Sequence, residues 1–488
     1  MYNIFDKLKN YSDSDYYAFH MPGHKRNLDL MDGTSPYRID ITEIDGFDDL
    51  HHAEGILRDA QERAARVYHA DETHFLVNGS TVGILSAILG TTEKGDSILV
   101  ARNCHKSVYH AIYLNELDPV YLYPKFDTEQ GLSTEIDAAD VQKALEEHPK
   151  IRAVMIVSPT YDGVVSDIEK IAEIVHAKGC PLIVDEAHGA HFGFDPYFPK
   201  SANIYGADLV INSLHKTLPA LTQTALLHVN GDMVKRRKVK QYLDMLQTSS
   251  PSYILMASID ACIGMLEETL ETHSDARSDY KYKNIFSEYA NRIEALRKDL
   301  KRLKYLKIIQ TDNTDRYDRS KFVISVKHAP MSSHELYEIL LHRYHLQMEM
   351  LAGTYVLAMT TVGDTQEGLD RLRDALLEID KEIDTRQGRP AAIETDLPLS
   401  GRQPALEKVW TIAEAVNRRD KIQKRSFEDS IGCISVEYAY LYPPGSPLIV
   451  PGERITKEAV EILHWYQEHD FSIEGLQAED GIEVWIDG

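Results

Sequence analysis

Short apolar runs alternate with stretches of helical periodicity between residues 51 and 250. Strands that alternate with helices form a mainly parallel sheet with helices on both of its faces. A chain of 488 residues is also too long to fold around one small hydrophobic core, so we predict an α/β fold of more than one domain. The apolar runs are Ser97–Ala101, Val120–Tyr123, Ala153–Val157, Leu182–Val184 and Leu209–Ile211, and the helical patterns cover 80–90, 105–115, 135–148 and 167–178.

The remainder of the chain indicates further parts. Residues 252–304 are helical and charged, and Phe322–Val326 begins a smaller α/β unit. A linker is expected at Thr385–Pro390 and Arg402–Pro404. The expected divisions are a polar N-terminal segment (1–50), a large domain with an interdomain helix (51–305), a small α/β domain (306–385) and a C-terminal domain (386–488).

Two of the apolar runs end in reactive side chains. Asp185 follows Leu182–Val184, and Lys216 comes shortly after Leu209–Ile211. Because open α/β sheets bind ligands at the carboxyl ends of their strands, this carboxylate and this amine are expected at one edge. Pyridoxal 5′-phosphate needs both groups: Lys216 to form a Schiff base and Asp185 to hold the pyridine nitrogen protonated. Taken singly, each residue would more often be a surface lysine or a helix N-cap.

A third motif makes the pair more specific. A short apolar run breaks at Gly79, and a helical pattern follows it, which places Gly79, Ser80 and Thr81 at a helix N-terminus. Free amide groups and the positive end of the helix dipole make such a turn a phosphate site. A phosphate turn, a carboxylate and a lysine in this order predict a pyridoxal-phosphate site.

Two other chemistries are disfavoured. Asp185–His188 spells a helicase box, but the chain has no GxxxxGK[ST] phosphate loop, which nucleotide hydrolysis requires. His188 and His191, with the nearby acids, could be metal ligands, but they do not form an HExxH pattern and no cysteine is close. We therefore expect no metal.

Composition narrows the partners and the cellular compartment that we expect for the protein. A formal net charge of −24 argues against nucleic acid and against anionic membrane surfaces. Only four cysteines occur, far apart and without a CxxC, which favours a reduced cytoplasm. Met1–Asp15 lacks the apolar core of a signal peptide, and no later run is long enough to span a bilayer.

Seven motifs carry a family resemblance: Phe19–Lys25, Asp45–His51, Asn103–Ser107, Asp185–His191, Ser213–Lys216, Thr248–Tyr253 and Tyr442–Pro447. Their order resembles that of the ornithine/lysine/arginine decarboxylases, pyridoxal-phosphate enzymes of the aspartate-aminotransferase fold (fold type I). The chain resembles the shorter members, which lack an N-terminal wing, and biosynthetic arginine decarboxylases most. The resemblance implies release of carbon dioxide and an amine from a basic L-amino acid, with arginine favoured over lysine or ornithine.

The resemblance also implies roles for cofactor-binding residues. His105 would stack on the cofactor ring and Ala187 would contact its other face, with His188 beside it in the same motif. Ser213 and His215 would join Gly79, Ser80 and Thr81 in holding the phosphate. Without the resemblance, His105 would be interpreted as a helix-capping or core histidine.

Other implied roles concern the substrate and a second subunit. Ser250 would reach the phosphate of the partner subunit, so we expect a homodimer or higher homo-oligomer with shared sites. Glu453 would bind the distal cation of the substrate, although glutamates in such loops are mostly solvated. Asp48 and Asp49 are the next candidates for that role.

The reaction is the least determined feature, because this scaffold serves several reactions of the same cofactor. A same-fold aminotransferase or another pyridoxal-phosphate lyase is the alternative enzyme. A catalytically inactive relative with a binding or regulatory role is the alternative of another class, and intact Lys216 and Asp185 argue against it.

Overall fold

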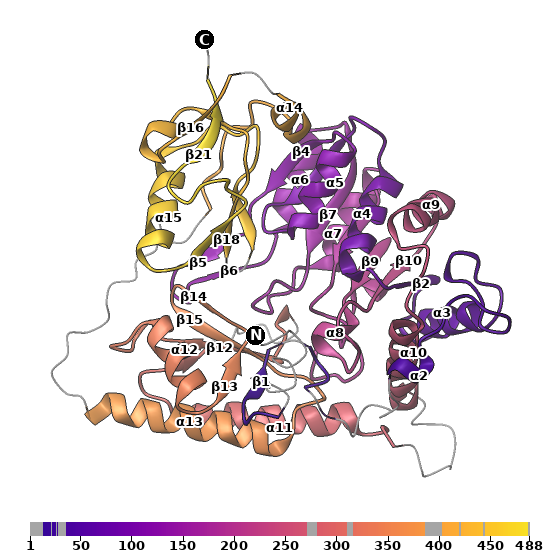
Figure 1. Cartoon of the computed structure of the whole chain (residues 1–488), viewed down its shortest axis with the longest axis vertical. Coiled ribbons are helices and arrows are strands. Elements are labelled where there is room, and N and C mark those ends of the chain that lie inside the picture. The colour runs from indigo at the N-terminus through magenta and orange to yellow at the C-terminus, as the bar shows by residue number, and fades with distance from the viewer. Residues whose placement is uncertain are drawn as a thin grey trace.

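A seven-stranded sheet forms the centre of the large domain in this computed structural model (Figure 1). Neighbouring strands are parallel, except that β10 runs antiparallel to both of its neighbours, β2 and β9. The prediction of a mainly parallel sheet is therefore confirmed. The strand order is β2 (Glu72–Leu76), β10 (Ala225–Val229), β9 (Leu209–Asn212), β8 (Leu182–Asp185), β7 (Ile151–Val157), β3 (Ser97–Ala101) and β4 (Asp118–Leu122).

The structure describes most, but not all, of the chain. Of the expected linker, Thr385–Pro390 with Arg402–Pro404, only Thr385, Gln403 and Pro404 lie within the described residues. Met21, Pro443 and Pro444 of the family motifs lie outside them. The described residues are 13–20, 22–25, 27, 36–270, 281–309, 316–385, 403–418, 421–442 and 445–486.

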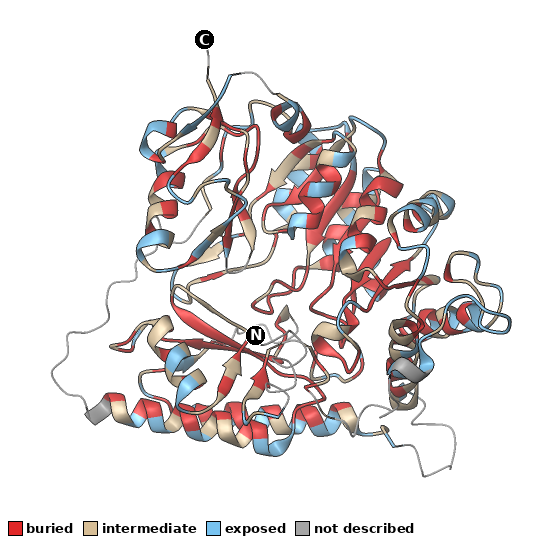
Figure 2. Cartoon of the chain, in the orientation of Figure 1, coloured by how far each residue is buried: buried red, intermediate tan, exposed pale blue. Residues whose placement is uncertain are grey.

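Helices cover the large sheet, and four of them lie at the stretches 80–90, 105–115, 135–148 and 167–178 that the periodicity predicted. Asp137 and Asp167 begin α6 and α7 by accepting hydrogen bonds from backbone amides of the first turns, as N-cap aspartates do. The strands β8, β9 and β10 are buried at every position, whereas several covering helices alternate buried and exposed positions (Figure 2). The helices are α4 (Gly79–Thr91), α5 (Lys106–Leu114), α6 (Ala138–Glu147), α7 (Ile168–Ala177) and α9 (Arg236–Leu246).

A smaller α/β unit follows the charged helices α10 (Tyr253–Leu270) and α11 (Ile285–Leu300). The expected boundary at residue 305 falls between α11 and the first strand of this unit. The unit also pairs with the N-terminal segment, because β1 (Tyr17–Phe19) runs parallel to β13 (Leu346–Met348). Its strands are β11 (Lys307–Ile308), β12 (Lys321–Ser325), β15 (Tyr355–Met359) and β14 (Met350–Ala352), and its helices are α12 (Ser333–His342) and α13 (Gln366–Thr385).

The C-terminal part folds on a core of its own and packs against the large domain. Ile412 and Val450 extend into the core of the large domain, which joins the two parts. Its elements are α14 (Ile412–Asn417), β16 (Ile422–Arg425), β17 (Ile434–Ser435), β18 (Ala439–Tyr442), β19 (Ser446–Ile449), α15 (Lys457–Glu468), β20 (Ser472–Glu474) and β21 (Ile482–Trp485).

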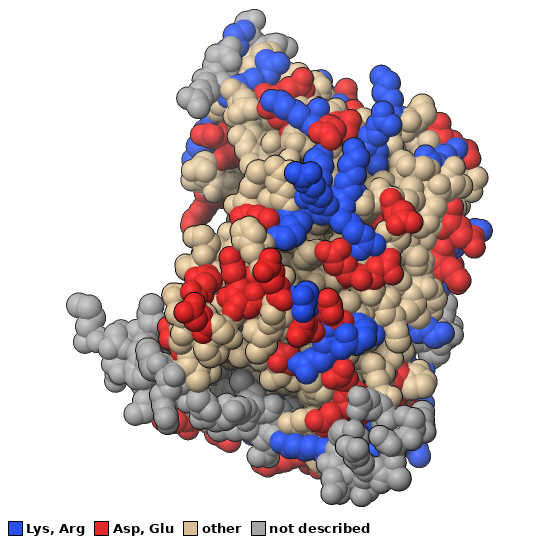
Figure 3. Space-filling model, turned by 90° about the vertical axis from the view of Figure 1, so that its right-hand side faces the viewer, with Lys and Arg blue, Asp and Glu red and all other residues tan. Residues whose placement is uncertain are grey.

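The surface is mixed in charge despite the net negative total. Figure 3 shows Lys and Arg side chains gathered in the upper half of one face, with Asp and Glu side chains below and around them. α9, whose sequence contains Arg236, Arg237, Lys238 and Lys240, lies on this side of the molecule. Among the described helices, none combines the length and the apolar character that crossing a membrane requires.

Candidate active site

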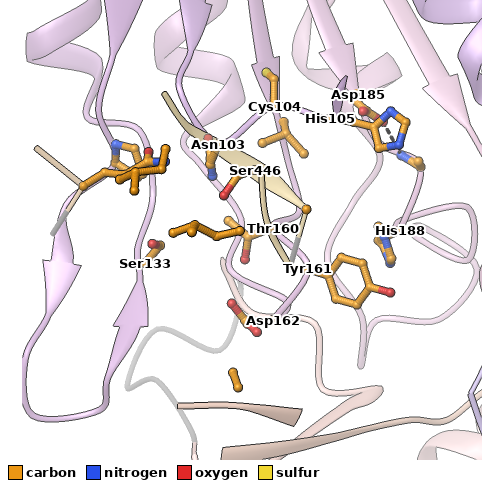
Figure 4. A pocket seen from close by; sticks show the side chains of 18 of the residues that line it. Asn103, Cys104, His105, Ser133, Thr160, Tyr161, Asp162, Asp185, His188 and Ser446 are labelled. Atoms are coloured by element: carbon orange, nitrogen blue, oxygen red, sulfur yellow. Dashed lines mark hydrogen bonds between the residues drawn. The ribbon is translucent and has the colours of Figure 1, made fainter. Parts of the chain in front are cut away.

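A cavity of about 380 Å³ opens at the carboxyl ends of β8 and β9, where the three domains meet. The large domain contributes Asp185 and Lys216, the small domain Tyr355, and the C-terminal domain Ser446. Figure 4 shows Asp185, His105 and His188 at one side of the cavity, and Ser133 and Asp162 at the other. Three of the predicted cofactor residues thus lie together at one side of the cavity.

The strand ends bring Asp185 and Lys216 to the same cavity, as predicted. Asp185 is the last residue of β8, and Lys216 lies in the short helix α8 (Leu214–Thr217) after β9. Asp185 is buried and accepts a hydrogen bond from the amide of Ala187 (3.1 Å). Burial raises the pKa of Asp185, and the charge of Lys216 opposes that rise. Burial lowers the pKa of Lys216, which favours the neutral amine needed for Schiff-base formation.

The predicted phosphate turn also lines this cavity. Gly79 has φ +71° and begins α4, and a Cβ added there would meet no atom within 4 Å, so open space lies beside the turn. Asn78 does not cap the helix with its side chain; instead its Oδ1 accepts a hydrogen bond from the amide of Thr248 (3.2 Å). The hydroxyls of Ser80 and Ser213 contact each other, which joins the turn after β2 to the turn after β9.

Two histidines have partners that orient their rings. His215 lines the cavity and its Nδ1 contacts the carbonyl of Thr224 (2.9 Å). His105 is the N-cap of α5, where its Nδ1 accepts a hydrogen bond from the amide of Ser107 (3.2 Å). The capping role considered for His105 is thus present, and the ring opens onto the cavity as well. Burial and the nearby Lys216 lower its pKa to about 4, so the ring is neutral.

His188 lies between two lysines. Its Nε2 is 3.1 Å from Nζ of Lys216, and its Nδ1 is 3.3 Å from Nζ of Lys321 on β12. The ring of Tyr161 covers it at a centroid distance of 4.5 Å. His191 turns away to Asp318 (3.0 Å), so the two histidines considered as metal ligands have different partners.

The sequence analysis did not anticipate the role of the His-Met-Pro-Gly-His-Lys segment. The amide of Gly23 donates to the carbonyl of His215 (2.6 Å), and its own carbonyl accepts from the hydroxyl of Thr361 (2.6 Å). The segment therefore bridges the lysine-bearing helix and the small domain. A Cβ on Gly23 would come within 2.7 Å of the backbone of Leu218, so this contact requires glycine.

Asp162 was missed as well. It follows β7, lines the cavity and is buried, and the hydroxyl of Tyr355 donates to its Oδ1 (2.5 Å). Burial raises the pKa of Asp162 to about 6. The only signal in the sequence was an aspartate and a glycine after an apolar run, which describes many turns.

The structure does not bring Glu453 to the cavity, and this argues against the predicted contact with substrate. The side chain is 0% exposed and forms an ion pair with Arg102 (2.8 Å), which is also 0% exposed. Its Oε2 also accepts a hydrogen bond from the amide of Val450 (2.9 Å). Glu453 is thus not a solvated loop acid, because it joins the C-terminal domain to the end of β3. Its contact with the substrate stays a prediction.

The predicted partner-subunit contact, Ser250, and the two alternative substrate acids, Asp48 and Asp49, do not line the cavity either. Ser250 is exposed in the loop after α9 and is not part of the cavity wall. Asp48 accepts hydrogen bonds from the amides of Gly55 and Leu57, and Asp49 accepts one from His51, so both acids stabilise the N-terminal turns of their own chain. The contact of Ser250 with a partner subunit stays a prediction.

The residues present fit pyridoxal phosphate. An open turn at a helix N-terminus, a buried carboxylate at a strand end and a lysine with a lowered pKa share one cavity. Together with the mainly parallel sheet and the smaller α/β unit, they define a fold type I pyridoxal-phosphate enzyme.

The comparison with known families identifies the chain more closely. Residues 3–340 match the family described as "Orn/Lys/Arg decarboxylase, major domain", and residues 402–484 match its C-terminal domain. The chain belongs to the Orn/Lys/Arg decarboxylase family, and it is a pyridoxal-phosphate-dependent amino-acid decarboxylase.

Individual relatives cover nearly the whole chain. The Bacillus subtilis protein YaaO is 36% identical over 468 residues, which cover 94% of this chain and 93% of that protein. An arginine decarboxylase of the same organism is 31% identical over 469 residues, covering 94% of this chain and 92% of that enzyme. Among solved structures, the lysine decarboxylase LdcF of Francisella novicida superposes with a TM-score of 0.78 at 18% identity, covering 98% of this chain and 80% of that one.

Proposed function

We propose that the enzyme decarboxylates a basic L-amino acid, with arginine the favoured substrate, to yield the corresponding amine and carbon dioxide. The observation that carries this proposal is the charge of the cavity wall. Among the described residues, Lys216 is the only Lys or Arg that lines the cavity, and it is assigned to the cofactor. The acids of the wall are Asp185, also assigned to the cofactor, and Asp162.

Asp162 is the group that we assign to the distal cation of the substrate. It lines the same cavity as Asp185 and His105, and Figure 4 shows it apart from them. A buried carboxylate pairs favourably with a desolvated ammonium or guanidinium group. The identity to an arginine decarboxylase over 94% of the chain supports a guanidinium.

The same wall favours loss of the carboxylate over transamination. An aminotransferase gains from a cation that holds the substrate carboxylate in place, whereas such a cation would oppose departure of that group as neutral carbon dioxide. When bound, pyridoxal phosphate withdraws electrons from Cα and so makes the bond between Cα and the substrate carboxylate labile. Lys216 Nζ, whose near neighbour is His188 Nε2 at 3.1 Å, is placed in the cavity to return a proton to Cα.

One experiment tests the substrate and the role of Asp162 together. Carbon dioxide release should be measured for arginine, lysine and ornithine with the wild type and with Asp162→Asn. We expect the highest kcat/KM with arginine, and a drop of tens-fold or more in the variant, since truncating a buried charge partner costs about 2–5 kcal/mol. Cofactor absorption should not change.

A matched control neutralises a buried acid away from the cavity. Glu437 is buried, its pKa is raised by burial, and it accepts hydrogen bonds from the amides of Gln477 and Glu483 in the C-terminal domain. It does not line the cavity, so Glu437→Gln should retain the wild-type order and size of kcat/KM on the three amino acids.

Two outcomes would contradict the proposal. If a keto acid forms and no carbon dioxide is released, the reaction is wrong. If Asp162→Asn retains wild-type kcat/KM on all three basic amino acids, Asp162 does not bind the distal cation.

A further inference from the structure

Lys321 is a buried lysine with an unusual set of neighbours. It begins β12, its side chain is 0% exposed, and within the described residues its Nζ forms no ion pair within 4.0 Å. Its direct partner is Nδ1 of His188, at 3.3 Å. Gly163 has φ +99°, and a Cβ there would come within 2.9 Å of the Lys321 side chain, so the glycine makes room for it. Burying an ammonium group is costly, which suggests that this one has a role.

The two lysines that face His188 cannot play the same part. Neutral imidazole has one donor nitrogen and one acceptor nitrogen. Burial and the charges of Lys216 and Lys321 keep the pKa of His188 well below its usual value, so the ring is neutral. The lysine that accepts from the ring must therefore be a neutral amine, whereas the lysine that donates to the ring can be an ammonium group.

The nearby acids determine whether Lys321 or Lys216 keeps its positive charge. Asp318 and Glu349 favour the charged form of Lys321, and its pKa remains about 8 despite burial. Lys216 is supported by Asp185 and Glu349, but Asp185 is the group that pairs with the cofactor ring. Other titratable groups near these side chains are Lys25 and Asp162 beside Lys321, and Tyr161, His105 and His215 beside His188.

We propose that Lys321 is a positioning residue for Lys216 and acts through His188. Its ammonium group donates to Nδ1 and thereby fixes the tautomer that carries the hydrogen on Nε2. That N–H points at Nζ of Lys216 and holds it as a neutral amine, the form that reacts with the cofactor aldehyde. The proposal rests on the assignment of Lys216 as the cofactor lysine, which the test below measures separately.

The test uses the full-length chain, purified with cofactor and then freed of it by hydroxylamine and dialysis. Lys216 is acylated with trace acetic anhydride across pH 6–11 (about the range in which buried lysines titrate), and its modification is measured by mass spectrometry. We expect Lys321→Met to raise the pH midpoint of Lys216 by about one unit or more, because Lys216 then keeps its own proton. Lys327→Met is the matched control, since Lys327 follows the same strand and, within the described residues, its Nζ donates to the carbonyls of Thr128 and Glu129.

A double-mutant cycle separates action through the ring from direct repulsion between the lysines. In a His188→Phe background, Lys321→Met should shift the midpoint much less than in the wild type. An equal shift in both backgrounds, or no shift in either, would overturn the proposal. Lys321→Arg should preserve the low midpoint because it retains the charge.

A measurement on the wild type tests the proposal even if the variants do not fold. Nitrogen NMR of the histidine-labelled, cofactor-free chain reports which ring nitrogen of His188 carries the hydrogen. Hydrogen on Nε2 supports the proposal, and hydrogen on Nδ1 contradicts it. Failure of Lys216 to capture added pyridoxal phosphate, with the Nε2 tautomer present, would instead refute the assignment of the cofactor lysine.

Discussion

At the scale of single residues, burial sets the chemistry of the site. The same desolvation that raises the pKa of Asp185 lowers that of Lys216, so each group moves toward its neutral form while the cavity is free of cofactor. The second acid of the motif, Glu186, is likewise buried with a pKa of about 7, but it accepts hydrogen bonds from Ser201 and Asn212. Adjacent acids thus have separate roles, one toward the cavity and one toward the core.

Replacing the two cofactor residues should give different results. Lys216→Ala should abolish the visible absorption of lysine-bound cofactor and nearly all turnover, with the fold intact by circular dichroism. Asp185→Asn should still bind cofactor but lose orders of magnitude in kcat, because an uncharged partner does not hold the ring nitrogen protonated. Near-normal turnover in Asp185→Asn, or a colourless wild type that binds no added cofactor, would contradict these roles.

Asp162 should make stability depend on pH. Its pKa is raised from 3.8 to about 6 in the folded state, so its contribution to stability is full below pH 3.8 and is lost as the pH rises through 6. Asp162→Asn removes this titration and keeps an acceptor for Tyr355. Relative to wild type, the variant should therefore gain up to about 3 kcal/mol between pH 4 and pH 7.5, measured by urea unfolding. An unchanged difference between the two proteins at both pH values would contradict the buried, titrating carboxylate.

At the scale of elements, the pattern of apolar runs predicted most of the large domain. Ser97–Ala101 was predicted with the bounds that the structure has, because this buried strand lies between polar turns on both sides. The placement of Asp185 and Lys216 followed from strand ends alone. The antiparallel course of β10 could not be predicted in this way, because its five residues are all buried and carry no mark of direction.

Replacing Gly23 tests the contact between the N-terminal segment and the backbone that follows the Lys216 helix. Gly23→Ala would place a Cβ within 2.7 Å of the Leu218 amide and carbonyl, immediately after the helix that carries Lys216. Because backbone must move to relieve that overlap, we expect a loss of about 1–3 kcal/mol in the free energy of unfolding. Cofactor should also dissociate faster, which dialysis followed by absorption measures. Gly264→Ala is the control, since a Cβ there meets nothing within 4 Å; equal behaviour of the two variants would refute the contact.

At the scale of the whole molecule, the cavity is built where three parts of the chain meet, and long-range pairs hold these parts together. Arg102 and Glu453 are 351 residues apart in sequence, so no local pattern could have revealed their pairing. Local reasoning left Glu453 as a loop acid, and the family resemblance assigned it to the substrate. Burial and an opposite charge from another domain are properties of the fold, which explains why both interpretations missed this contact.

The Arg102–Glu453 pair should therefore contribute to stability and to the joining of domains. Glu453→Gln leaves the guanidinium of Arg102 buried without its counter-charge, for which we expect a loss of about 3–5 kcal/mol in the free energy of unfolding. Arg102 also donates to the carbonyl of Leu448 (3.0 Å) and lies over the ring of Tyr121, so it cannot turn to solvent without disturbing β19.

Arg102→Met combined with Glu453→Leu should recover much of the loss, because apolar side chains of similar volume often replace a buried ion pair without cost. Urea unfolding of the two single variants and the double variant measures the coupling. If Glu453→Gln is as stable as wild type and reduces only kcat/KM for the basic amino acid, Glu453 acts on the substrate after all, and the ion pair with Arg102 is not its role.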